Sequence, residues 1–273
     1  MSSMEISRPT YEKFRDMFAQ GIRFDNRKLD EYRTLEVTLP VSNKAEGSAR
    51  VKLGKTEVVV GVKLEVGTPY PDSLDKGNLM VSADLLPMAS PRFEPGPPGF
   101  DAVELPRLVD RAIRESGMID LKKLVVVEGE KVWTVIIDIY PINDDGNLVD
   151  AATIGAIVAL KNAHLPGLKE NNLPDYKHPT KTALPLVGDI APLSVSFFKL
   201  GSAIVIDPTR EEQEACDVRV TLGVSKKKGT YFINSCQKAG ELPVSSEEFS
   251  AMASKLPELF ETLNEKLKNC LKD

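Results

Sequence analysis

Hydrophobic and polar residues alternate along several stretches of the chain, and this period of two is typical of β-strands with one buried face. The strands fall into two groups with a proline-rich segment between them. Glycines such as Gly54, Gly129 and Gly201 stand between neighbouring strands, so we expect antiparallel hairpins there. The predicted strands cover residues 49–53, 57–64, 79–86, 122–128, 131–140, 192–199, 202–207, 217–225 and 229–238.

Apolar residues follow a helical period in other parts of the chain. Residues 9–20 and 246–270 predict amphipathic helices. Residues 150–164 are apolar on almost all sides, so we expect this helix to lie buried against a sheet. A further helix follows the loop 93–99. Two groups of strands together with a few long helices predict an α+β fold with antiparallel or mixed sheets.

The helix after the loop 93–99 carries three arginines, Arg107, Arg111 and Arg114, which lie four and three residues apart. This spacing places their guanidinium groups along one helical face. The loop itself contains three prolines and two glycines, so it is stiff and irregular. A rigid loop beside an arginine-rich helix is typical of a surface that binds a polyanion.

Acidic residues in the same helix offer a second interpretation. Each arginine has a carboxylate three or four residues away, and such pairs stabilise a solvent-exposed helix by roughly 0.2–0.5 kcal/mol each. On spacing alone, a salt-bridged surface is favoured over a polyanion site. The pairs are Glu104 with Arg107, Asp110 with Arg114, and Arg111 with Glu115.

Because of Pro106, the sequence allows two interpretations of how this helix begins. Asp101 and Glu104 stand three residues apart and resemble a capping pair, which would place the proline inside the helix at some cost. Either the first turn is irregular or the helix begins near Leu105.

Composition limits the classes of function. The chain has 273 residues and a formal net charge of −5, so any contact with nucleic acid must come from a local patch or from a site shared with a partner. Its three cysteines are scattered, which is typical of reduced cysteines in an intracellular protein. No apolar run reaches the length of a membrane span. We therefore expect a cytoplasmic protein without membrane contact.

A weak internal repeat indicates two similar halves. Residues 51–54 (VKLG) precede a valine-rich strand, and residues 198–201 (FKLG) precede another apolar strand. The proline-rich segment 166–188 is the best candidate for a surface connection between the halves. We therefore predict a first half over 1–165, including the N-terminal helix, and a second half over 189–273.

A set of short motifs spread over nearly the whole chain resembles the RNase PH-like family. The similarity is greatest to the ring subunits of the archaeal exosome that lack an active site. Two departures are Asn26, where glycine is usual, and Pro106, where alanine is usual. The motifs are 21–27 (GIRFDNR), 31–33 (EYR), 45–49 (AEGSA), 51–54 (VKLG), 69–72 (PYPD), 93–98 (FEPGPP), 109–116 (VDRAIRES), 144–147 (DDGN) and 206–208 (IDP).

The resemblance implies a duplicated α+β fold and a ring of six subunits, built as three heterodimers with a catalytic RNase PH-like paralogue. It also implies that RNA is threaded through the ring and degraded from its 3′ end by inorganic phosphate. A cap of separate RNA-binding subunits is expected on one face. Phosphate and Mg²⁺ would be used by the partner's active site, so we expect this chain to have no cofactor of its own.

Two features of active family members are changed in this chain. Active members carry a Gly-Thr-Arg or Gly-Ser-Arg turn at the start of the central helix to hold phosphate, whereas residues 147–150 read Asn-Leu-Val-Asp. Asp150 would repel phosphate and could serve as the helix N-cap. Active members also carry two aspartates six residues apart. Asp207 matches the first, but Gln213 replaces the second, and we interpret Asp207 as a conformational residue before Pro208.

The sequence therefore predicts no catalytic residue and no metal site in this chain. The leading hypothesis is a non-catalytic ring subunit that binds RNA through Arg107, Arg111 and Arg114 and completes the partner's active site. Two alternatives remain open. One is an autonomous phosphorolytic exoribonuclease or nucleotidyltransferase, and the other is a purely structural ring scaffold whose arginines are tied up in salt bridges.

Overall fold

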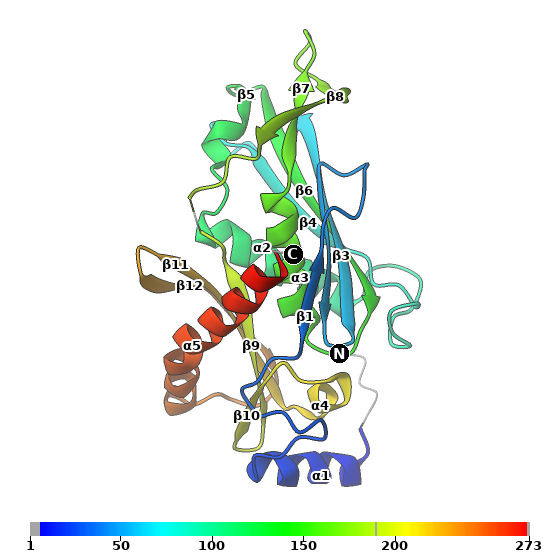
Figure 1. Cartoon of the computed structure of the whole chain (residues 1–273), viewed down its shortest axis with the longest axis vertical. Helices are drawn as coiled ribbons and strands as arrows, with labels where there is room; N and C mark the ends of the chain where they lie inside the picture. The colour runs from blue at the N-terminus through cyan, green and yellow to red at the C-terminus, as the bar shows by residue number, and fades with distance from the viewer. Residues whose placement is uncertain (1–5, 189, 272–273) are drawn as a thin grey trace.

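The computed structural model describes residues 6–188 and 190–271. The predicted strands of the first half lie in one six-stranded sheet, which also contains β1 (Figure 1). Its order is β1-β2-β3-β6-β4, and β5 pairs with β6. All pairs are antiparallel except β4 with β6, which run parallel, so the sheet is mixed. The strands are β1 (Leu35–Thr38), β2 (Gly47–Leu53), β3 (Thr56–Gly67), β4 (Asn78–Ala83), β5 (Val125–Val127) and β6 (Lys131–Asn143).

The second half contains a four-stranded antiparallel sheet in the order β10-β9-β11-β12. The turn between β9 and β10 lies at Gly201, as the sequence predicts. The end of the β11–β12 hairpin has Lys228 and Gly229 at positive φ, as a two-residue turn requires. The strands are β9 (Leu193–Leu200), β10 (Ala203–Ile206), β11 (Val218–Lys227) and β12 (Thr230–Gly240).

The segment between the halves is more regular than the sequence indicates. Residues 166–188, predicted as a surface connection, carry most of a two-stranded hairpin of β7 (His164–Leu168) and β8 (Pro174–Ala183). Prolines normally argue against strands because they cannot donate to the ladder. In a two-stranded sheet each strand keeps one free edge, so prolines are tolerated on it.

The helices include the four that the apolar period predicts. The central helix α3 packs on β2, β3 and β6 of the first half and on β9 of the second, so its predicted burial is confirmed (Figure 1). A Cβ at Gly155 would meet Val60 Cγ2 at 2.7 Å, which explains a glycine at this crossing. The helices are α1 (Arg8–Ala19), α2 (Phe100–Ser116), the 3₁₀ helix η1 (Leu121–Leu124), α3 (Leu148–Lys161), α4 (Arg210–Ala215) and α5 (Ser246–Cys270).

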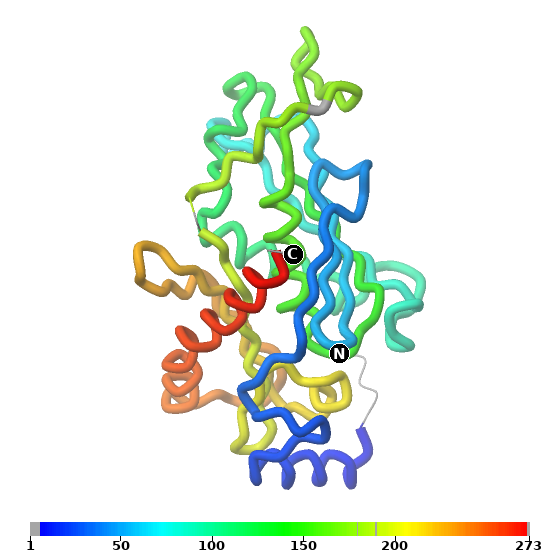
Figure 2. Tube along the Cα trace, in the orientation of Figure 1, coloured from blue at the N-terminus to red at the C-terminus, as the bar shows by residue number. Residues whose placement is uncertain are grey.

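One continuous apolar core joins the two halves. It includes Val60 of β3, Ile157 of α3, Val195 of β9 and Leu263 of α5, all fully buried. The C-terminal helix α5 runs back across the molecule and packs on β1 as well as β9 (Figure 2). The α+β class with mixed sheets is therefore confirmed, and the helix shared between the sheets holds them together.

The N-terminal helix packs differently from its predicted assignment. Its place in the sequence, directly before those strands, predicts that it belongs to the first half. Its apolar side, Phe14 and Phe18, instead forms a small core with Phe198, Leu200 and Val205 of the second half. The reason is that the apolar face of a short helix packs on whichever surface completes its burial, and sequence order does not fix that surface.

Two local predictions are wrong. Residues 122–128 form the end of η1 followed by the short strand β5, and not one strand. Helix α2 begins at Phe100 with Gly99 as its N-cap, so Asp101 and Glu104 are not a capping pair. Pro106 lies inside the helix and is buried, although it cannot donate the hydrogen bond of a regular turn.

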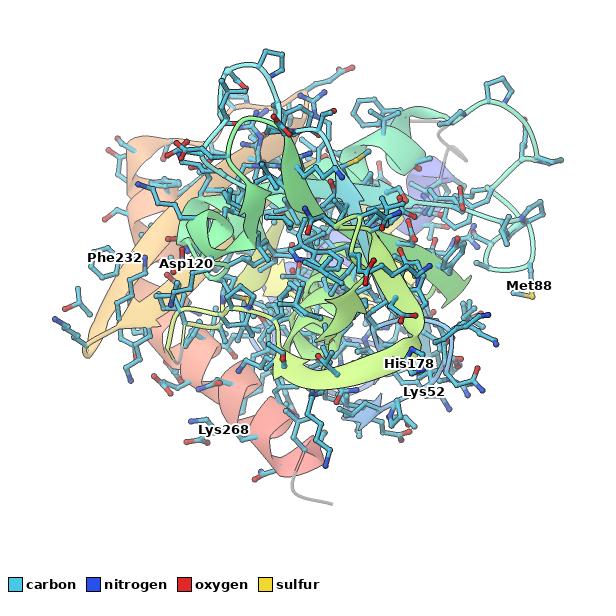
Figure 3. All side chains as sticks on the ribbon, turned by 90° about the horizontal axis from the view of Figure 1, so that it is seen from above. Lys52, Met88, Asp120, His178, Phe232 and Lys268 are labelled. Atoms are coloured by element: carbon cyan, nitrogen blue, oxygen red, sulfur yellow. The ribbon has the colours of Figure 1, made fainter. Side chains whose placement is uncertain are left out.

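The loop before α2 exposes apolar side chains. Met88 projects from the surface at the edge of the molecule, with 68% of its side chain exposed (Figure 3). Within residues 6–188 and 190–271, no helix has the length and apolar character needed to cross a membrane.

Candidate functional site

The three predicted RNA-binding arginines lie on the exposed face of α2. Arg114 is held by an ion pair, because its Nη2 lies 2.6 Å from Asp110 Oδ1 and its Nε lies 3.0 Å from Asp110 Oδ2. Arg114 Nη2 also donates to the carbonyl of Leu79 on β4 at 2.9 Å. This arginine therefore fits the salt-bridge interpretation.

Arg107 and Arg111 behave differently from Arg114. Glu104 does not pair with Arg107, because it binds Arg219 of β11 at 2.6 Å. In the part of the chain that the structure describes, Arg107 and Arg111 have no hydrogen bond or ion pair. Two of the three guanidinium groups are therefore free to bind an anion, and their role in RNA binding stays a prediction.

A neighbouring side chain binds one backbone N–H at the start of α3. Asn147 is the N-cap and adopts the left-handed conformation, with φ 56°. Its backbone N–H donates to Gln213 Oε1 at 2.8 Å. Gln213 lies on α4, which begins with a capping box between Thr209 and Glu212. A neutral amide thus binds a helix N-terminus of the kind that holds phosphate in active family members.

Asp150 does not act as the N-cap, contrary to our prediction. It is the third residue of α3 and is fully buried. Its carboxylate accepts hydrogen bonds from Asn147 Nδ2 at 3.0 Å, from the Ser196 N–H at 3.2 Å and from Ser196 Oγ at 2.8 Å. These contacts direct Asp150 toward β9 and into the protein, so the expected repulsion of phosphate is not its role.

Burial raises the pKa of Asp150 to about 7, and the hydrogen bonds from Asn147 and Ser196 only partly offset this effect. The folded chain therefore keeps a proton that an exposed aspartate loses near pH 4. It follows that this residue makes the fold less stable as the pH rises from about 4 to about 7.

Replacing Asp150 with asparagine should remove this pH dependence, because the amide can keep hydrogen bonds without ionising. We expect the free energy of unfolding of Asp150→Asn, relative to that of the wild type, to increase by roughly 2–3 kcal/mol between pH 5 and pH 8. Urea unfolding at several pH values measures this difference. Parallel pH profiles for the two proteins would show that Asp150 does not titrate in this range.

Asp207 is the centre of a buried ion-pair network. It has φ 47°, so its conformational role is supported, and its side chain is fully buried. Its carboxylate accepts from the Arg33 N–H at 2.8 Å, from Arg33 Nε at 3.0 Å and from Arg33 Nη2 at 2.7 Å. Asn147 Nδ2 donates to it at 3.0 Å. The prediction missed this second role of Asp207.

The N-terminal arginines complete this network. Arg23 is 1% exposed and donates to Glu212 through Nε at 2.9 Å. Arg27 Nη1 lies 3.0 Å from the carbonyl oxygen of Asp207. The sequence shows these arginines only as local positive charge, because their partners Glu212 and Asp207 lie more than 170 residues away. Within the described residues, no three His, Cys, Asp or Glu side chains are grouped to hold a metal ion.

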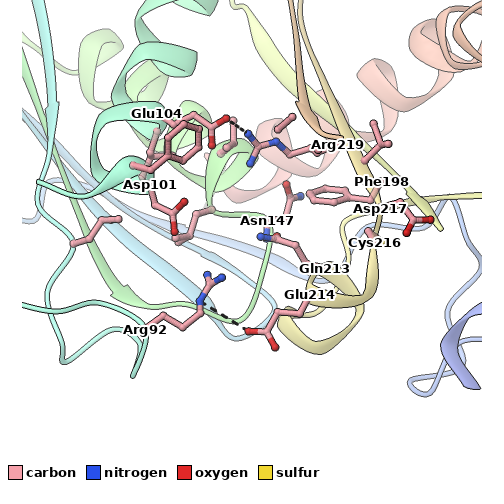
Figure 4. Close-up of a pocket in the computed structure, with 18 of the residues that line it drawn as sticks. Arg92, Asp101, Glu104, Asn147, Phe198, Gln213, Glu214, Cys216, Asp217 and Arg219 are labelled. Carbon is pink, nitrogen blue, oxygen red and sulfur yellow. Dashed lines mark hydrogen bonds and ion pairs between the residues drawn. The ribbon is translucent and has the colours of Figure 1, made fainter. Parts of the chain in front are cut away.

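A cavity of about 140 Å³ opens between α2, the start of α3, α4 and β11 (Figure 4). Gln213 and Asn147 form part of its wall, whereas Asp150 and Asp207 do not. Glu104 of α2 lies beside Arg219 of β11, and Arg92 of the loop before α2 lies beside Glu214 of α4 (Figure 4). The polar residues of the lining are Arg92, Asp101, Glu104, Asn147, Gln213, Glu214, Asp217 and Arg219.

Comparison with known proteins places the chain in a family. Residues 31–166 match the family model described as "3′ exoribonuclease family, domain 1", and residues 191–253 match the model of domain 2 of the same family. The exosome complex component Rrp42 of Methanocella arvoryzae is 43% identical over 91% of each chain. The Rrp42 of Archaeoglobus fulgidus is 46% identical over 80% of each chain.

Solved structures of archaeal exosome chains are also similar to this chain. A chain of the Archaeoglobus fulgidus exosome with RNA bound to the active site is 40% identical, with a TM-score of 0.86, covering 94% of this chain and 97% of that one. A chain of an archaeal exosome core is 37% identical, with a TM-score of 0.82 and coverages of 95% and 96%. The chain therefore belongs to the 3′ exoribonuclease family of RNase PH-like proteins, and exosome components named Rrp42 are among its relatives.

Proposed function

We propose that this chain is a non-catalytic RNA-binding subunit of an exosome ring, which supports 3′-to-5′ phosphorolytic degradation of RNA by a catalytic paralogue. One observation carries the non-catalytic part. Gln213 binds the N–H of Asn147 at the start of α3, where active members hold phosphate. Phosphate attacks an anionic diester, so phosphorolysis depends on positive groups around it. Gln213 supplies a neutral acceptor there instead.

The second part of the proposal concerns partners. The relatives named Rrp42 are exosome components, and one similar structure has RNA bound to an active site. By analogy, this chain forms a heterodimer with a catalytic RNase PH-like paralogue, and three heterodimers form the ring. Separate RNA-binding subunits cap it, and the complex works in the cytoplasm. Phosphate and Mg²⁺ belong to the paralogue's site.

RNA contacts are assigned to α2. Arg107 and Arg111 are exposed and free of partners in the described structure, so they bind RNA phosphates directly. Arg114 contributes less, because Asp110 already neutralises it. That ion pair is also the observation that favours the alternative of a purely structural scaffold.

A phosphorolysis assay tests the proposal. The isolated chain is incubated with RNA, Mg²⁺ and inorganic phosphate, in parallel with its complex with a catalytic paralogue. We expect nucleoside diphosphates from the complex and none from the isolated chain. Omitting phosphate provides the control, since a contaminating hydrolase does not need it. Phosphate-dependent release of nucleoside diphosphates by the isolated chain would establish the autonomous nuclease and contradict the proposal.

A further inference from the structure

The cavity between α2, α3, α4 and β11 has the size and lining of a site for an organic ring. Its volume of about 140 Å³ far exceeds the roughly 10–15 Å³ that one water molecule needs. Much of its wall is apolar, with Phe93, Leu105, Val149 and Phe198 among the residues that line it. A small ion gains nothing from such walls, whereas a planar ring does.

Three buried polar atoms in the lining residues lack hydrogen-bond partners within the described structure. They are Arg92 Nε, Asn147 Oδ1 and Arg219 Nε. Asn147 is only 1% exposed, so its free oxygen has little access to bulk solvent. Buried polar groups are normally satisfied, and these three need one donor and two acceptors. The polar part of the lining is therefore not fully hydrogen-bonded, although these atoms themselves are covered by neighbouring side chains.

The charges of the cavity disfavour an anionic ligand. Asp101, Glu104, Glu214 and Asp217 outnumber the two arginines. Both arginines are also already paired. Arg219 binds Glu104, and Arg92 binds Asp144 at 2.8 Å and approaches Glu214 at 4.0 Å (Figure 4). The ligand is therefore an uncharged group, and a phosphate must stay outside.

Phe100 connects the cavity to the arginines of α2. It lines the cavity, yet the residue is 60% exposed. Arg107 lies seven residues further along the same helix, about 10 Å away by helical rise. An RNA strand whose phosphates lie on Arg107 and Arg111 could thus reach the cavity with a nearby base, and Phe100 could stack on that base.

We propose that the cavity binds one unstacked base of the RNA strand held by α2, with its phosphate left outside. This inference rests on the proposed RNA-binding function. The cavity has apolar walls and more carboxylates than cations, and these suit a neutral heterocycle better than an anion. The chain would then fix the position of the strand by a base as well as by its phosphates.

An NMR titration that measures the binding of adenosine to the full chain tests the proposal without RNA. We expect adenosine to bind more tightly than ADP, and Phe100→Ala to weaken adenosine binding about tenfold. Val103→Ala is the matched control, because Val103 is exposed on the same helix but does not line the cavity. No binding of adenosine, tighter binding of ADP, or equal effects of the two substitutions would overturn the proposal.

A second readout uses RNA that contains 2-aminopurine, which fluoresces more strongly when it is unstacked. Binding to the complex with the paralogue should raise the fluorescence, and Phe100→Ala but not Val103→Ala should reduce the rise. Arg107→Ala/Arg111→Ala should weaken RNA binding while leaving free adenosine binding unchanged. Failure of the cavity proposal thus appears in the adenosine titration, and failure of the proposed RNA-binding function appears in the arginine variant.

Discussion

Replacing Asp207 with alanine should destabilise the folded chain by about 3–5 kcal/mol, because it removes the buried counter-charge of a buried guanidinium and leaves only the partly exposed Asp145 near it. Arg33 is 7% exposed and donates three of its hydrogen bonds to this carboxylate. Asn147 Nδ2 also loses one of its two acceptors. The free energy of unfolding in urea measures the loss.

Two further variants separate charge from backbone conformation. Asparagine tolerates the left-handed conformation of residue 207 but carries no charge. If the charge of Asp207 is what stabilises the fold, Asp207→Asn should therefore lower the free energy of unfolding almost as much as Asp207→Ala. Asp145→Ala also removes a carboxylate that faces Arg33, but its side chain is 30% exposed. We expect a cost of at most about 1 kcal/mol there. An Asp207→Asn variant as stable as the wild type would reduce Asp207 to a conformational residue.

Local periodicity predicted most of the elements, because burial on one face fixes the spacing of apolar residues. The helix over 246–270 is the clearest case, since its buried residues lie on one face. The helix over 150–164 was recognised instead by its almost uniformly apolar sequence, and it lies between both sheets. The hairpin of β7 and β8 was missed because its prolines suggest a loop. Their tolerance depends on how many neighbours a strand has, which local sequence does not show.

The charged residues of the site were harder to predict because their partners are distant in sequence. Spacing offered Glu104 as a partner for Arg107, yet Glu104 binds Arg219 of β11 across the fold. Asp150 was expected at the helix cap, but Asn147 occupies that position and Asp150 lies one turn further in. In the sequence, Gln213 is visible only as the residue that replaces an aspartate of active family members. Its contact with the start of α3 is seen only in the tertiary structure.

RNA binding by the Arg107→Ala/Arg111→Ala variant should be weaker by at least about tenfold, since two charged contacts to phosphate are lost. The slope of log affinity against log salt concentration is negative, and its magnitude should also fall by about 1.4, the value for two contacts to a single strand. Arg114→Ala should have a smaller effect, because Asp110 already pairs with that side chain. Fluorescence anisotropy of labelled RNA gives both quantities.

The salt dependence of RNA binding, measured in the complex with the catalytic paralogue, tests most directly whether α2 holds RNA for the partner's site. Lys177→Ala/Lys181→Ala is the matched control, because it removes two exposed positive charges from β8. The arginine variant should lose affinity and slope while the lysine variant keeps both. An arginine variant with wild-type affinity and wild-type slope would contradict RNA binding by α2 and leave the chain as a structural scaffold.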